Sequence, residues 1–143
     1  MPCATIAPVT GTPSIVFLCV HNAGRSQIAA AFARDLGGDR VAVFSGGSDP
    51  GAEVNPNAVA AMFEVGIDMS AAIPAKWTDE IIRGADVVVT MGCGDECPYF
   101  PGVVYRDWEL KDPWGLSVEA IRPMRDEIEQ RVTALLEEFD AIG

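Results

Sequence analysis

One short segment of the sequence combines the residue types that bind an oxyanion and attack it. It reads Cys19-Val-His-Asn-Ala-Gly-Arg25-Ser26, with five residues between the thiol and the guanidinium. A planar guanidinium grips two oxygens of a tetrahedral anion at once, and a cysteine thiolate is a strong nucleophile. Ser26 is placed to donate a hydrogen bond to that thiolate or to a loop carbonyl. The spacing therefore predicts Cys19 as a nucleophile and Arg25 as an oxyanion clamp.

This segment, the oxyanion loop, lies between a predicted buried strand and the start of a predicted helix. Backbone N–H groups at a helix start bind anions without a lysine cluster, and the helix dipole favours the thiolate over the thiol. Asn22 tolerates left-handed geometry and can brace the loop, while Gly24 lets its backbone curl. His21 is interpreted as a loop residue without a catalytic role. We expect the anion to meet the backbone of the residues from the loop's second position onward: Val20, His21, Asn22, Ala23, Gly24, Arg25 and Ser26.

Three further cysteines are present, and two of them form the pattern Cys93-x3-Cys97. A structural zinc site needs four nitrogen or sulfur ligands, and His21 is the only histidine, so no metal site is predicted. In a reducing cytosol such a pair is more typical of redox chemistry than of a structural disulfide. The alternative is that Cys93 and Cys97 are small packing groups beside a turn. The corresponding alternative for Cys19 is an inert, buried cysteine. Cys3 has no predicted role.

The elements that must position these residues alternate between strand and helix. Apolar runs predict strands over 14–20, 41–45, 87–91 and 103–107. Apolar stripes at helical spacing predict helices over 26–36, from Asn55-Pro56 to Gly66, from Thr78 onward, and around 128–139. Such alternation predicts an α/β fold with a parallel sheet and helices on both faces. Ligands of these sheets lie beyond the carboxyl ends of the strands, where the oxyanion loop begins.

Length and charge narrow the class of protein further. A chain of 143 residues is the size of one domain, and we expect a flexible tail over residues 1–13 followed by a single catalytic domain over 14–143. The net charge of -11 argues against nucleic acid as a partner. No apolar run approaches the ~20 residues of a membrane span, and the start has no secretory signal pattern. These features predict a cytoplasmic protein with no membrane partner.

The segment CVHNAGRS after a strand resembles the phosphate loop of low-molecular-weight protein tyrosine phosphatases and of the arsenate reductases that share their fold. The similarity extends from about Ser14 to the end of the chain. Residues 55–70 and the stretch RPMRDEI over 122–128 look like the arsenate reductase branch. The resemblance implies a three-layer fold with a four-stranded parallel sheet, no tightly bound cofactor, and arsenate as substrate, with phosphate or sulfate as competing anions.

A role for Asp112 also follows from the resemblance. Asp112-Pro113 alone is a turn signal, but in the resembled family an Asp-Pro at this place supplies the general acid that protonates the departing oxygen. That role requires partial burial to favour the protonated carboxyl. Asp107, Glu109 and Asp95 are competing carboxylates without comparable support.

The resemblance further implies a relay of thiols, because reducing arsenate to arsenite requires two electrons. Cys93 would attack the Cys19–arsenic adduct and form a disulfide with Cys19, and Cys97 would resolve it to Cys93–Cys97. An external reductant then opens that disulfide. Thioredoxin is favoured, whereas relatives without the later cysteines use mycothiol and mycoredoxin. Several thioredoxin-linked relatives carry a further cysteine where this chain has Gly24.

Two alternatives stay open at this point. A phosphatase acting on phosphotyrosine or a small phosphate ester would use the same loop, and Trp114 would supply an aromatic wall. A non-enzymatic module that binds oxyanions or senses redox state would bind phosphate without turnover. The cysteine pair favours the reductase over the phosphatase, and the combination of nucleophile, clamp and acid favours an enzyme over a binding module.

Overall fold

The computed structural model describes residues 12–92 and 99–139. Most of the predicted N-terminal tail lies outside this range, and so do Cys3, Cys93 and Cys97. Within the described range, no helix is both long enough and apolar enough to cross a bilayer.

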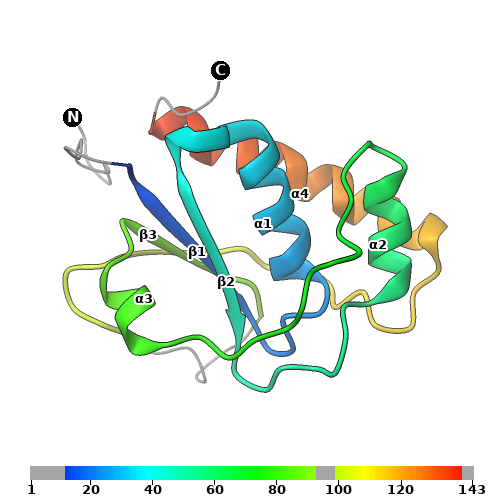
Figure 1. The fold of residues 1–143 in the computed structure, drawn as a ribbon, viewed down its shortest axis with the longest axis horizontal. Coiled ribbons are helices and arrows are strands. Elements are labelled where there is room, and N and C mark those ends of the chain that lie inside the picture. The colour runs from blue at the N-terminus through cyan, green and yellow to red at the C-terminus, as the bar shows by residue number, and fades with distance from the viewer. Residues whose placement is uncertain (1–11, 93–98, 140–143) are drawn as a thin grey trace.

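Four parallel strands form the sheet in the order β2-β1-β3-β4. Their bounds are β1 Ser14–Cys19, β2 Ala42–Gly47, β3 Val87–Thr90 and β4 Val104–Asp107. The four strands were predicted from apolar, β-branched runs, and each is confirmed to within a few residues. Because β1 pairs with both β2 and β3, its carboxyl end lies at the middle of the sheet edge (Figure 1). The fold class predicted from the sequence is confirmed.

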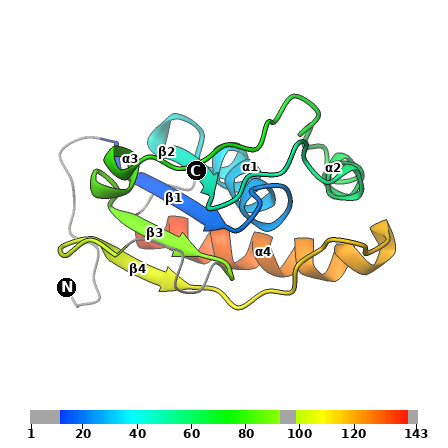
Figure 2. The same cartoon turned by 90° about the horizontal axis from the view of Figure 1, so that it is seen from below.

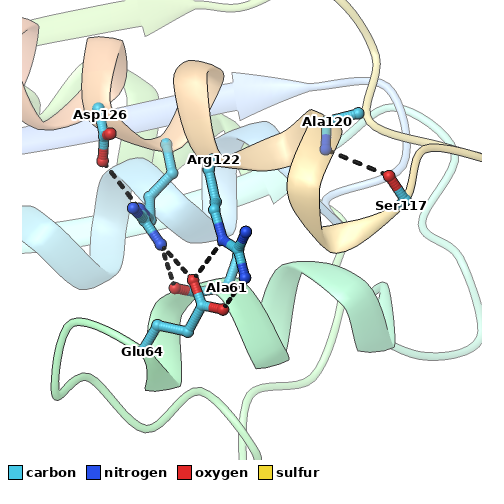
Figure 3. Close-up of polar contacts among 7 residues, drawn as sticks. Ala61, Glu64, Ser117, Ala120, Arg122 and Asp126 are labelled. Carbon is cyan, nitrogen blue, oxygen red and sulfur yellow. Dashed lines mark hydrogen bonds and ion pairs between the residues drawn. The ribbon is translucent and has the colours of Figure 1, made fainter.

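The helices follow the strands as the sequence predicts. Their bounds are α1 Arg25–Gly37, α2 Pro56–Phe63, α3 Asp79–Arg83 and α4 Val118–Glu138, with a short 3₁₀ turn η1 over Gly38–Arg40. Asn55 and Thr78 cap α2 and α3 through their side-chain oxygens. Ser117 caps α4 by accepting a hydrogen bond from Ala120 N–H (Figure 3). α4 begins about ten residues before the apolar stripe that predicted it, because its first turns also bury Ile121 and Met124.

The two faces of the sheet carry different amounts of helix. Alternate residues of β1 point to opposite faces. Ile15, Phe17 and Cys19 join the core formed with α1, α2 and α4, whereas Val16 and Leu18 join a smaller core with α3. Figures 1 and 2 show α1 and α4 side by side, α2 outside them, and α3 away from this group. The sheet and the helices on its two faces form three layers, and the start of α1 lies just beyond the carboxyl end of β1.

α2 is fixed to α4 by an ion-pair cluster at its carboxyl end. Glu64 accepts hydrogen bonds from Arg122 at 2.6 and 2.9 Å and from Arg125 at 2.9 Å. The mostly buried Arg125 also donates to the Ala61 carbonyl at 2.8 Å and to Asp126 at 2.9 Å (Figure 3). The two guanidinium groups lower the pKa of the Glu64 carboxyl to about 2. α2 is thereby held as a rigid support whose amino end faces the oxyanion loop.

Candidate active site

The oxyanion loop turns its carbonyl groups away from the centre of the loop. Three of them accept hydrogen bonds from outside it: Asp49 N–H donates to Val20 O, Gly51 N–H to His21 O and Asn55 N–H to Ala23 O, at 2.8, 2.9 and 2.7 Å. Among the described residues, none accepts a hydrogen bond from the backbone N–H groups of residues 21–26. These N–H groups lead into α1 and form its first turn from Arg25 onward, so the loop has the geometry of an anion site.

The thiol of Cys19 is buried and is held by a chain of hydrogen bonds. Its Sγ lies 2.9 Å from Ser26 Oγ, which in turn accepts a hydrogen bond from Asn22 Nδ2 at 2.7 Å. The Asn22 side chain is itself oriented, because its Oδ1 accepts from Gln27 Nε2 at 3.1 Å and from Ala75 N at 2.9 Å. With its Oδ1 occupied, Asn22 presents its NH₂ group to Ser26 Oγ, which leaves the Ser26 hydroxyl proton free to be donated to a Cys19 thiolate.

Asn22 is the non-glycine residue with positive φ in the described part of the chain, at 51°. This is the left-handed conformation that the sequence predicts for it. Gly24, which was predicted to let the backbone curl, also has a packing role. Its φ is -141°, but a Cβ there would lie 2.5 Å from Pro113 Cγ. The glycine is therefore needed for the close approach of the loop that carries Asp112.

Arg25 is only 7% exposed and lies between two other segments of the site. Its Nη1 donates to the Leu110 carbonyl at 3.2 Å, and its Nη2 lies 3.8 Å from Asp112 Oδ2. Gly92, which follows β3 with a φ of 90°, packs directly against Nη1. The guanidinium thus contacts the acid-bearing loop on one side and the end of β3 on another.

These groups surround one pocket of about 720 Å³. Cys19, Arg25 and Asp112 line it together with part of the oxyanion loop, and Trp114 and Glu53 lie at its wall. The pocket is much larger than a tetrahedral oxyanion, so a reacting group larger than the anion can enter it. The structure therefore brings the predicted nucleophile, clamp and acid to the same cavity.

Two of the competing carboxylates, Asp107 and Glu109, lie outside the pocket that Asp112 lines. Asp107 accepts a hydrogen bond from Thr90 Oγ1 at 2.8 Å at the edge of the sheet, and neither it nor Glu109 lines the pocket. Asp95 and the pair Cys93 and Cys97 lie outside the described residues. His21 lies at the rim, where its ring contacts the Asp49 carbonyl at 2.9 Å. Within the described ranges, no group of three or more His, Cys, Asp or Glu side chains is arranged to hold a metal ion.

Four residues of the site were missed or only partly interpreted from the sequence: Gln27, Asn55, Asn57 and Gly92. Asn55 begins a predicted helix and caps it, but its side chain also donates to the Pro113 carbonyl at 3.4 Å. Asn57 donates to Leu116 and Gln27 to the Ile73 carbonyl, both far away in the chain, so local spacing carries no signal for these contacts. Gly92 makes room for the Arg25 guanidinium, a contact that no local pattern indicates.

Comparison with known proteins identifies the family of this chain. Residues 14–96 match the family described as low molecular weight phosphotyrosine protein phosphatase. A putative arsenate reductase of Halobacterium salinarum is 41% identical over 135 residues, covering 90% of this chain and 94% of the relative.

Solved structures lead to the same group. A thioredoxin-dependent arsenate reductase of Corynebacterium glutamicum superposes with a TM-score of 0.80 at 41% identity, covering 92% of this chain and 64% of that one. An arsenate reductase in its phosphate-binding state gives a TM-score of 0.77 at 34% identity, covering 89% of this chain and 98% of that one. This chain therefore belongs to the low molecular weight phosphotyrosine protein phosphatase family and, within it, to the group of arsenate reductases.

Proposed function

We propose that this protein reduces arsenate to arsenite, with Cys19 as the nucleophile, Arg25 as the oxyanion clamp and Asp112 as the general acid. The observation that carries the proposal is the shared pocket. Its floor holds the Cys19 thiol, 2.9 Å from Ser26 Oγ, and its wall holds Arg25 and Asp112 with 3.8 Å between their charged atoms. A nucleophile, a clamp and an acid in one cavity are the parts that displacement at a tetrahedral oxyanion requires.

The first step forms a bond between Cys19 Sγ and arsenic. Arsenate seats its oxygens on the N–H groups of the oxyanion loop and on Arg25, and Ser26 holds the thiolate in place. One oxygen leaves as water, with a proton from Asp112, whose half-exposed carboxyl lies at the pocket wall. Arsenic remains pentavalent in this adduct, so no electrons have yet moved.

Reduction requires a second thiol. We assign this role to Cys93, because it follows β3, whose carboxyl end lies beside that of β1. Its thiolate attacks Cys19 Sγ, the S–As bond breaks, and its electron pair stays on arsenic, which leaves as trivalent arsenite. Cys97 then attacks Cys93, releases the Cys19 thiolate and completes a Cys93–Cys97 disulfide, which an external dithiol reduces.

Thioredoxin is the reductant that we favour, and the thioredoxin dependence of the Corynebacterium glutamicum relative supports this choice. A protein dithiol reacts with an accessible disulfide by the same exchange chemistry as the internal relay. Mycothiol with mycoredoxin is the alternative. It requires only the Cys19 adduct and makes the later cysteines dispensable.

The test is arsenite production from arsenate with each reductant system, comparing wild type with Cys19→Ser, Cys93→Ser and Cys97→Ser. Cys3→Ser is the matched control, since it also removes one of the four thiols and should leave turnover unchanged. Turnover with thioredoxin that disappears in the first three variants supports the full relay. Turnover with mycothiol alone, insensitive to Cys93 and Cys97, supports the reductase without the relay.

One observation favours a phosphatase as the second candidate. Trp114 is 78% exposed beside Asp112 and lines the pocket, where its ring could stack on an aryl leaving group. Cys19-dependent hydrolysis of an aryl phosphate, with no arsenite formed under either reductant system, would replace the reductase with this activity.

A further inference from the structure

The loop that carries Asp112 joins β4 to α4 and is anchored at its start. Trp108 is buried, its N–H donates to the Thr90 carbonyl at 2.8 Å, and its ring lies 5.9 Å from that of Phe17. Beyond Trp108 the loop is largely exposed except at Pro113, which is buried, and the Asp112 side chain is 50% exposed. Packing of Pro113 against Gly24 holds the chain directly after the acid, whereas the exposed turn that follows depends on polar contacts.

The orientation of the Asp112 carboxyl depends on the turn that follows it. Asp112 Oδ1 accepts a hydrogen bond from Trp114 N–H at 3.0 Å, while Oδ2 faces Arg25 Nη2 at 3.8 Å. The turn continues with Leu116 N–H donating to the Pro113 carbonyl at 3.0 Å, and Gly115 adopts a φ of 80°. Any movement of the turn over 113–116 therefore rotates the carboxyl away from the pocket.

Two asparagine side chains at the amino end of α2 hold this turn. Asn57 Nδ2 donates to the Leu116 carbonyl at 2.9 Å, and Asn55 Nδ2 donates to the Pro113 carbonyl at 3.4 Å. Asn55 is buried, its N–H binds Ala23 O in the oxyanion loop, and its Oδ1 caps α2 through Asn57 N. The same end of α2 thus contacts both the loop of the nucleophile and the loop of the acid.

We propose that Asn55 and Asn57 are positioning residues that set the general acid Asp112 over Cys19 by holding the turn over residues 113–116 against α2. This inference rests on the acid role assigned to Asp112 in the proposed function. Both asparagines line the pocket, but their amides donate to backbone carbonyls of the acid loop and not to Cys19, Arg25 or Asp112. The ion-pair cluster at the other end of α2 supplies the fixed support that such positioning needs.

Asn57 offers the cleaner test because, among the described residues, its side-chain amide donates to the Leu116 carbonyl alone. Asn57→Ala removes the donor to Leu116 and retains the helix. Loss of one hydrogen bond corresponds to about a threefold to tenfold effect, which we expect as a decrease in kcat/KM for arsenate. The inhibition constant of inorganic phosphate should stay unchanged, because the oxyanion loop and Arg25 are intact. Backbone amide exchange at Trp114 and Leu116 should become faster.

A double-mutant cycle separates positioning from a general loss of structure. In the Asp112→Asn background, Asn57→Ala should cause no further decrease, since there is no acid left to position. Asn55→Ser, which keeps a capping oxygen but removes the donor to Pro113, should behave in the same way. Thr78→Ala is the control: it removes the cap of α3, at a comparable cost to stability, and should leave kcat/KM at the wild-type value.

The outcomes distinguish failure of this inference from failure of the acid assignment. Equal decreases in the wild-type and Asp112→Asn backgrounds would show a purely structural role and overturn the inference. A fully active Asn57→Ala beside a slow Asp112→Asn would overturn it as well, and would leave Asp112 as the acid. A fully active Asp112→Asn would remove the acid assignment and this inference together.

Discussion

At the scale of single residues, the site depends on side chains whose orientation is fixed by their neighbours. Asn22 can only donate to Ser26 because Gln27 and Ala75 occupy its oxygen. Arg25 is fixed in a similar way by the Leu110 carbonyl and by contact with Gly92. Nucleophile and clamp are thus positioned before any anion arrives, which reduces the reorganisation needed during the reaction.

Gly92 provides the sharpest test of this arrangement, because Gly102 is a matched control. Both glycines have positive φ, 90° and 92°, but a Cβ at Gly92 would collide with the Arg25 guanidinium, whereas one at Gly102 would have open space. Alanine at either position should cost similar stability from backbone strain. Only Gly92→Ala should weaken phosphate binding, by about tenfold to hundredfold, the range for hydrogen bonds to charged groups.

Phosphate affinity can be measured as protection of Cys19 from iodoacetamide, resolved by peptide mass spectrometry because the chain has four cysteines. Equal phosphate affinities in the two alanine variants would show that Arg25 does not need the space beside Gly92. Equal losses in both would assign the effect to backbone strain rather than to the guanidinium.

At the scale of elements, the sequence predicts what depends on local pattern. The strand before Cys19, the helix after it and the cap at Asn55 all follow from apolar runs and capping residues, and the structure confirms them. The contacts of Asn57 with Leu116 and of Asn22 with Ala75 depend on how the loops fold back against one another. No residue spacing encodes those contacts, so the support of the acid loop could be recognised only in three dimensions.

The attachment of α2 to α4 makes a prediction about pH. Arg122 and Arg125 lower the pKa of Glu64 from 4.5 to about 2. A carboxyl whose pKa is lower in the folded state stabilises the fold above its unfolded pKa, and this contribution is lost as the pH falls through the folded value. Glu64→Gln should therefore be less stable than wild type at pH 7, and the difference should shrink between about pH 4.5 and pH 2.

Urea unfolding at a series of pH values measures this difference. Glu129→Gln is the control, because Glu129 lies on α4 and its side chain forms no ion pair with a described residue. A stability difference for Glu64→Gln that stays constant down to pH 2 would mean that the carboxylate charge does not hold α2 to α4.

At the scale of the whole molecule, an acidic protein binds an anion. The chain has 21 acidic and 10 basic side chains, and the pocket wall itself includes Glu53 and Asp112 beside Arg25. The long-range field therefore repels arsenate, and the attraction is local, supplied by backbone N–H groups and one guanidinium. This combination of long-range repulsion and local attraction was expected from the net charge and the loop sequence alone, since net charge is a property of composition and not of the fold.

Salt should consequently speed the entry of anions into the site. Raising NaCl from about 0.01 M to 0.15 M shortens the Debye length from about 30 Å to 8 Å and screens the repulsion. We expect alkylation of Cys19 by the anion iodoacetate to become severalfold faster, while alkylation by the neutral iodoacetamide stays nearly constant. The rate with iodoacetamide reports any effect of salt on the thiol itself. The ratio of the iodoacetate rate to the iodoacetamide rate therefore isolates the effect of the protein's electrostatic field. If the ratio instead falls with salt, the positive potential of the oxyanion loop reaches beyond the mouth of the pocket and outweighs the net charge of -11.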